Sequence, residues 1–160
     1  MESKEFKILF GKIATDNGYC SAFGAWYKFE DEATVIIKLQ KSNYGNYFQL
    51  LMKFYYSNVF NHSINKMDKE LVNHSVSHLT FSEPKDMRDT FDLDVEISSQ
   101  QRKANLTELF NIHLNVILEK AKTKNGALEM NEREEVYILP GVKNEIINSL
   151  HNTGDSYNDI

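Results

Sequence analysis

The feature that most constrains this fold is the alternation of apolar and polar side chains in three consecutive stretches of the sequence. The stretches cover residues 24–30, 33–41 and 47–57. Side chains that return to the same side every second residue have the period of a half-buried strand, and only short links separate the three stretches. The sequence therefore predicts an antiparallel meander. Ile36 interrupts the polar side of the middle strand, which indicates that this side is partly covered.

Three other stretches show the helical repeat, in which apolar residues recur every three or four positions. They cover residues 3–17, 99–122 and 140–151. Ser3 is a candidate N-cap for the first of these helices. Gly18 and Gly126 are expected to end the first and the second helix, because glycine adopts left-handed φ angles without strain.

The rest of the chain is less regular. Residues 77–82 and 90–97 alternate well enough to predict two further strands, and 58–76 fits either a short helix or an extended loop. The predicted fold class is α+β, an antiparallel sheet of about four to five strands with helices packed mainly on one face. Residues 1–151 are predicted to form a single domain, and the polar tail 152–160 is expected to fray.

Length, charge and cysteine content exclude several classes of protein. The 160 residues carry a net charge of −5, which argues against nucleic-acid binding because such proteins need a basic surface to displace counterions. The single cysteine, Cys20, cannot form an internal disulfide and fits a reducing compartment. The sequence has no apolar run of about 20 residues and no signal-peptide pattern at its start. We therefore expect a cytoplasmic protein that binds neither membranes nor nucleic acid.

Three short motifs follow one another in the first half of the chain. They are W-Y-K at residues 26–28, I-K-L-Q-K-S at 37–42 and the aromatic strand 48–54. Their order resembles an uncharacterised bacterial family, domain of unknown function 4304, over roughly residues 5–98, with Lys28 where that family usually has arginine. The resemblance implies a cytoplasmic α+β domain without known catalytic residues or cofactors. Some relatives occur near polymorphic toxin systems, which implies an immunity or antitoxin-like role.

The corner formed by Gln40, Lys41 and Ser42 is the first candidate site. With Lys28 on the neighbouring strand and Tyr44 in the following turn, it suits an anionic ligand or the carboxylate of a partner. The alternative is structural, with Gln40 satisfying backbone groups at the end of the sheet and Lys41 solvated. No catalytic residue and no cofactor is predicted.

Histidines and carboxylates give weak indications of a metal site. His74 and His78 are four residues apart, with His62 upstream, but dispersed surface histidines are the simpler interpretation. The alternating carboxylates of residues 92–96 fit either a divalent cation or the solvated face of an edge strand, and we prefer the edge strand. No metal is predicted.

An aromatic side of the third strand suggests a protein interface. Tyr47 and Tyr55, joined by Trp26 or Tyr27, are residue types enriched at such interfaces. The first hypothesis is a non-enzymatic protein-binding domain, of which an immunity or antitoxin-like protein is one version. Its acidic surface would steer it onto a basic partner such as a nuclease. The second hypothesis is a small-ligand or enzymatic site for an anionic molecule at the lysine corner described above. The sequence leaves the partner and the oligomeric state open.

Overall fold

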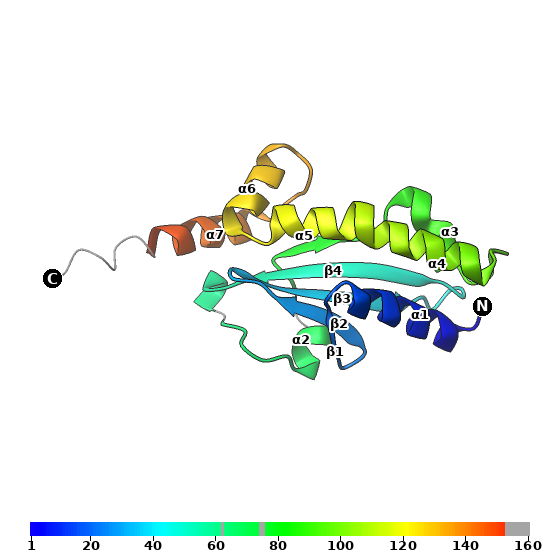
Figure 1. Cartoon of the computed structure of the whole chain (residues 1–160). Helices are drawn as coiled ribbons and strands as arrows, with labels where there is room; N and C mark the ends of the chain where they lie inside the picture. The colour runs from blue at the N-terminus through cyan, green and yellow to red at the C-terminus, as the bar shows by residue number, and fades with distance from the viewer. Residues whose placement is uncertain (62, 74–75, 153–160) are drawn as a thin grey trace.

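The three alternating stretches form the middle of a five-stranded antiparallel sheet with the order β1-β2-β3-β4-β5 (Figure 1). The computed structural model describes residues 1–61, 63–73 and 76–152. The strands are β1 Cys20–Ala22, β2 Ala25–Phe29, β3 Ala33–Lys41, β4 Phe48–Tyr56 and β5 Leu79–Phe81. Each strand pairs with its neighbour along the chain, so the predicted meander and the α+β class are confirmed.

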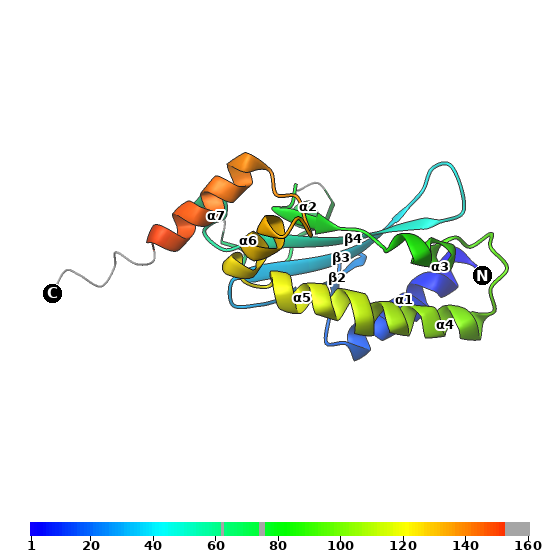
Figure 2. The same ribbon diagram turned by 90° about the horizontal axis from the view of Figure 1, so that it is seen from above.

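The helices lie mainly on one side of the sheet, as predicted (Figures 1 and 2). They are α1 Ser3–Asp16, α2 Lys69–Asn73, α3 Arg88–Phe91, α4 Ser99–Glu108, α5 Asn115–Ala121, α6 Lys124–Glu132 and α7 Pro140–Asn152. The predicted helix over 99–122 is observed as α4 and α5 joined by the π-helical turn Leu109–Leu114. Within the described residues, no helix has the length and apolar content needed to cross a bilayer.

The first face of the sheet is covered by α1 and by the α4–α5 rod. Phe10 of α1 lies between two other rings, with centroid distances of 5.0 Å to Trp26 and 5.4 Å to Phe110. Gly11 allows this close approach, because a Cβ atom there would lie 3.0 Å from the Trp26 ring. Burial of these large rings removes much apolar surface from water, which is the main source of stability in such a core.

The second face of the sheet is partly covered by α2 and the segment before it. This smaller core consists of Ala25, Ile36, Tyr55, Met67, Leu71 and Val72. Ile36 is fully buried there, which confirms that the polar side of β3 is partly covered. On the remainder of this face, toward the β3–β4 turn, Gln40 and Gln49 are exposed.

The predicted strand at 90–97 is wrong. Its first residues belong to α3, and only Asp92 makes an isolated bridge, to Tyr47. The reason is the buried Arg102 of α4, which donates hydrogen bonds to main-chain carbonyl oxygens of this segment. The acceptors are the oxygens of Asp89, Thr90, Asp92 and Val95. Because these oxygens bond to a guanidinium, they are not available for a neighbouring strand.

Three local details also differ from the prediction. The N-cap of α1 is Glu2 and not Ser3, and its carboxylate and that of Glu5 form a capping box. The short strand β1 was missed, although Phe23 and Gly24 both have positive φ and form the tight turn that joins it to β2. Gly18 does end α1 with φ +83, but Gly126 lies inside the unpredicted helix α6.

Residues 58–76 contain a short 3₁₀ turn, Val59–Asn61, and the helix α2. Of the predicted tail, only Asn152 is described, and it ends α7. Residues 153–160 lie outside the described residues, so the frayed tail and the single-domain division stay predictions.

Candidate functional site

The predicted lysine corner is not assembled. Lys28 pairs with Val35, five positions before Gln40 and so about 16 Å away along β3. Its ammonium group instead lies 4.4 Å from the centre of the Tyr19 ring. The alternation of β3 also sends the side chains of Gln40 and Lys41 to opposite faces. Lys28, Gln40 and Lys41 therefore do not converge on one ligand.

The residues that follow this corner form the tip of the β3–β4 hairpin. Lys41 donates a 2.9 Å hydrogen bond to the hydroxyl of Ser3 in α1. The hydroxyl of Ser42 accepts from the Tyr44 amide at 3.0 Å, and the Tyr44 side chain is 97% exposed. These contacts fix the turn and attach it to the start of α1.

The three aromatic residues of the predicted interface do not share a surface. Trp26 belongs to the first face, where only 9% of it is exposed, and Tyr55 is buried on the second face beneath α2. The Tyr55 hydroxyl contacts the carbonyl oxygen of Leu71 at 3.5 Å. Only Tyr47 is exposed. Because burying a large ring is favourable, the rings that alternate toward a covered face are used for packing.

Of the three histidines of the metal hypothesis, the structure describes His78. Within the described residues no group of three or more His, Cys, Asp and Glu side chains could hold a metal ion. His78 has a structural contact, since its Nδ1 accepts a 2.8 Å hydrogen bond from the amide of Tyr56. His62 and His74 lie outside the described residues.

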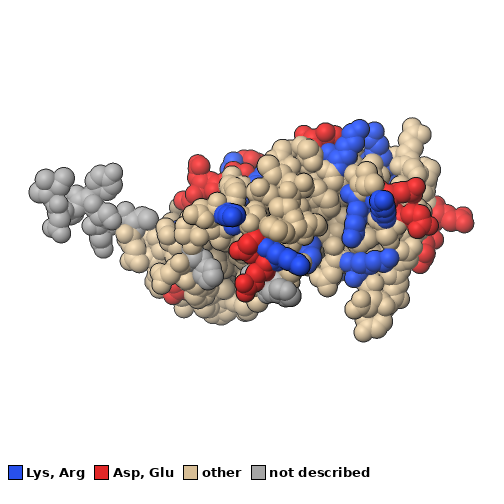
Figure 3. Space-filling model, turned by 90° about the horizontal axis from the view of Figure 1, so that it is seen from below, with Lys and Arg blue, Asp and Glu red and all other residues tan. Residues whose placement is uncertain are grey.

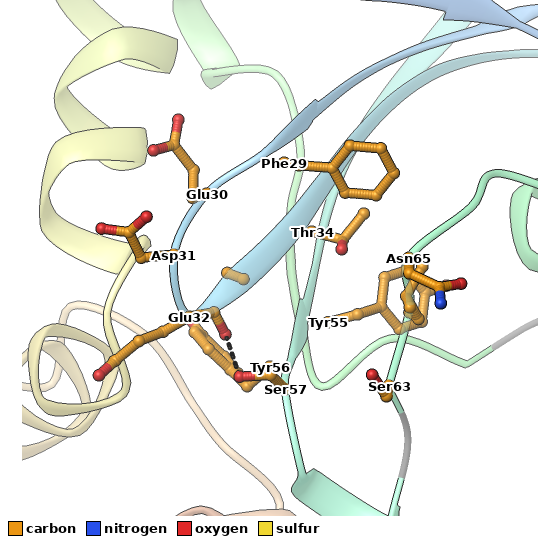
Figure 4. A pocket seen from close by; sticks show the side chains of 12 residues that line it. Phe29, Glu30, Asp31, Glu32, Thr34, Tyr55, Tyr56, Ser57, Ser63 and Asn65 are labelled. Atoms are coloured by element: carbon orange, nitrogen blue, oxygen red, sulfur yellow. Dashed lines mark hydrogen bonds between the residues drawn. The ribbon is translucent and has the colours of Figure 1, made fainter.

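A cavity at the end of the β2–β3 hairpin is the candidate site that sequence reasoning missed. Its volume is about 340 Å³, and it lies on the second face between the hairpin, the end of β4 and residues 63–65 (Figure 4). Phe29, Thr34 and Tyr55 form one row across three strands, because Phe29 pairs with Thr34 and Thr34 with Tyr55. We call this cavity the hairpin notch.

The walls of the hairpin notch are held by hydrogen bonds. The amide of Glu30 donates to the carbonyl oxygen of Ala33 at 2.8 Å and closes the hairpin. Ser57 donates to the carbonyl oxygen of Glu32 from its amide at 2.9 Å and from its hydroxyl at 3.4 Å (Figure 4). The carboxylate of Glu32 accepts a 2.7 Å bond from the amide of Lys124, which attaches the hairpin to α6.

The charge of the hairpin notch is at its rim and not in its interior. Figure 4 shows the carboxylates of Glu30 and Asp31 pointing away from Tyr55, toward α5. Both carboxylates act on Lys122. The pKa of Lys122 is raised, first by the 2.8 Å contact to Glu119 and further by the negative charges of Glu30 and Asp31. The interior is lined by aromatic rings, hydroxyls and the Asn65 amide.

A second cavity, of about 530 Å³, shares residues 63–65 with the hairpin notch. Its charged lining residues are Lys66, Asp68 and Glu70. The two cavities thus flank residues 63–65 and are bordered by carboxylates on both sides. The sequence did not reveal this arrangement, because the position of 63–65 follows from tertiary packing, although the run Glu30-Asp31-Glu32 does mark the acidic hairpin.

No protein-family model, no curated protein and no solved structure matches this chain. The resemblance to domain of unknown function 4304 therefore stays a prediction.

Proposed function

We propose that this domain binds another protein without catalysis, and that the hairpin notch is the centre of its binding surface. The observation that carries the proposal is Phe29, whose side chain is 48% exposed in a strand beside a cavity. The ring of Tyr27, on the same face, lies 5.3 Å from the Phe29 ring in an edge-to-face arrangement. Exposed aromatic rings beside a cavity are typical anchors of protein interfaces.

The rim determines the kind of partner. Glu30 and Asp31 border one side of the notch, and Asp68 and Glu70 border the adjoining cavity. Carboxylates around a centre of aromatic rings, hydroxyls and one amide favour a partner that places an uncharged side chain in the notch and basic side chains around it. The overall charge of −5 acts in the same direction by steering a basic protein toward the domain.

Inhibition of a basic enzyme, such as a nuclease toxin, is one specific form of this function. It agrees with the immunity-like role that the family resemblance implies. The alternative of an anionic-ligand site at the lysine corner has no geometric support, because its residues point to different places.

The proposal is tested by placing a photo-crosslinking amino acid at residue 29 and, as a matched control, at residue 44. Both side chains are exposed aromatics, but Tyr44 lies at the opposite end of the sheet in the β3–β4 turn. After irradiation in the native host, we expect one protein to be attached at position 29 and not at position 44.

The captured protein is then purified and titrated against the wild type, Phe29→Ala and Tyr44→Ala. We expect Phe29→Ala to weaken binding by at least about 10-fold, the usual effect of removing an interface anchor, and Tyr44→Ala to leave it unchanged. Binding should also weaken as salt is added, because charge steers the encounter. Equal crosslinking at both positions, or equal affinity of both variants, would refute the proposed surface.

A further inference from the structure

Two lysines lie side by side on the second face of the sheet, next to α2. Lys38 pairs with Leu51, and Lys53 pairs with Ile36 of β3 and Thr80 of β5. In this register Lys38 and Lys53 are diagonal neighbours on adjacent strands, about 7–8 Å apart at the backbone. Their flexible side chains are long enough to reach one common group.

Within the described residues, neither lysine has an ion-pair partner. Among the described residues, the ion pairs are those of Lys120 with Glu135 and of Lys122 with Glu119. Lys38 donates a 2.8 Å hydrogen bond to the side-chain oxygen of Asn73, the last residue of α2. An ammonium group has three donors, so two donors of Lys38 remain. No hydrogen bond of the Lys53 ammonium group is observed within the described part of the chain.

The pair is electrostatically unfavourable as it stands. Both lysines are only partly exposed, and like charges on neighbouring strands repel each other. The pKa of Lys53 is lowered, first by burial and then by Lys38, so each of these effects opposes its charge. Figure 3 views the side of the molecule that carries α2, where Lys and Arg side chains lie among Asp and Glu side chains.

From this juxtaposition we infer that Lys38 and Lys53 form the binding site of a phosphate group carried by a small molecule. A phosphate monoester has close to two negative charges at neutral pH, which match two ammonium groups. Lysine binds phosphate as a point charge and needs no fixed geometry. The hydroxyl of Thr80, opposite Lys53, is bonded to that of Ser77 and adds polar character to the site.

A nucleic-acid chain is a poorer fit than a small phosphate ester. Each phosphodiester has one charge, and binding of a strand requires basic side chains along an extended path. Here the positions on either side of Lys38 on this face are Ile36 and Gln40, and those of Lys53 are Leu51 and Tyr55. The site therefore favours one compact dianion, independently of the protein-binding function proposed above.

The test is thermal unfolding of the wild type, Lys38→Met, Lys53→Met and, as a control, Lys103→Met, since Lys103 is an exposed lysine of α4. Methionine keeps the apolar stem and removes the charge. The probes are inorganic phosphate, glycerol phosphate and a short single-stranded oligonucleotide, all at one fixed ionic strength.

We expect glycerol phosphate to raise the melting temperature of the wild type and of Lys103→Met, and to have no effect on Lys38→Met or Lys53→Met. A larger shift with glycerol phosphate than with inorganic phosphate identifies an ester as the ligand, and equal shifts identify free phosphate. Equal shifts in all four proteins overturn the site. Tighter binding of the oligonucleotide that is lost in Lys53→Met also overturns it in favour of a nucleic-acid surface. If the substitution itself alters the melting curves, a ³¹P NMR titration shows directly whether folded Lys53→Met still binds glycerol phosphate. Binding equal to that of the wild type overturns the site.

Discussion

The hydroxyl of Tyr56 donates a 2.6 Å hydrogen bond to the carbonyl oxygen of Ala121, which joins the last residue of β4 to the last residue of α5. The final carbonyl groups of a helix have no partner within the helix, so this bond satisfies a buried acceptor. We expect Tyr56→Phe to lower the free energy of unfolding by about 1–3 kcal/mol, because the carbonyl would stay buried without its donor. Urea denaturation measures the change. Tyr47→Phe is the control, since Tyr47 is exposed, and equal stability of the two variants would contradict the role of this bond.

Buried tyrosines predict a loss of stability in alkaline solution. Burial raises the pKa of Tyr55 to about 12 and raises that of Tyr19 and Tyr56 further, while the unfolded chain has the ordinary value near 10. Above about pH 10 the unfolded state releases these protons and the folded state keeps them, so stability falls by roughly 1.4 kcal/mol per pH unit for each tyrosine.

The measurement is the pH slope of urea unfolding in the wild type and in Tyr56→Phe. Lys53 and Lys124 have lowered pKa values and act in the opposite sense as pH rises toward their unfolded pKa. The difference between the two slopes isolates the tyrosine. A slope in Tyr56→Phe as steep as that of the wild type would show that Tyr56 ionises equally in both states.

Arg102 is expected to be among the residues that stability depends on most. It is fully buried, and burial lowers its pKa while Asp92 raises it. Arg102→Met leaves several carbonyl oxygens without a donor, and we expect a loss of about 3 kcal/mol or more. Arg102→Lys should recover little, because one ammonium group cannot span carbonyls that a guanidinium fork reaches. Hydrogen exchange should become faster in residues 89–97.

Arg88→Met is the matched control for Arg102, since Arg88 is exposed on α3. It should change stability by less than about 0.5 kcal/mol. Similar losses in the two arginine variants would mean that the bonds of Arg102 contribute little.

Gly126 and Gly141 should respond to alanine in opposite directions. A Cβ atom at Gly126 would overlap the carbonyl oxygen of Lys120 at the end of α5, whereas one at Gly141 would meet no heavy atom within 4 Å. We expect Gly126→Ala to destabilise by at least about 2 kcal/mol. Gly141→Ala should stabilise by about 0.4–1 kcal/mol through helix propensity and a less flexible unfolded chain. Thermal unfolding of the two variants measures the change in stability. A stabilised Gly126→Ala would disprove the close contact.

The parts of the fold that follow from local sequence were predictable. Strands β2, β3 and β4 and helices α1 and α7 repeat a two-residue or a helical pattern, and Gly18 ends α1 as expected. Gly126 is also a glycine, but it does not end a helix. It is required because α6 begins against the end of α5, and no pattern in the sequence distinguishes a close approach from a helix stop.

The candidate site was less predictable, because its residues are brought together by pairing register and tertiary packing. Lys28 and Gln40 are on neighbouring strands, as predicted, but Lys28 pairs with Val35 and so lies far from Gln40 along the strand direction. Trp26 and Tyr55 have the residue types of an interface, yet helices cover them on opposite faces. Lys38 and Lys53 are unremarkable in sequence and become neighbours only through the register of β3 and β4.

The bonds of Arg102 have a consequence for how this protein can evolve. They end on main-chain oxygens, which every amino acid provides, so these bonds do not require particular side chains at residues 89, 90, 92 and 95. Asp89 is exposed there and lines a cavity of about 470 Å³ at the start of β4. Descendants of this sequence can exchange the side chain of Asp89 and acquire new surface chemistry there while the bonds of Arg102 to the main chain are kept.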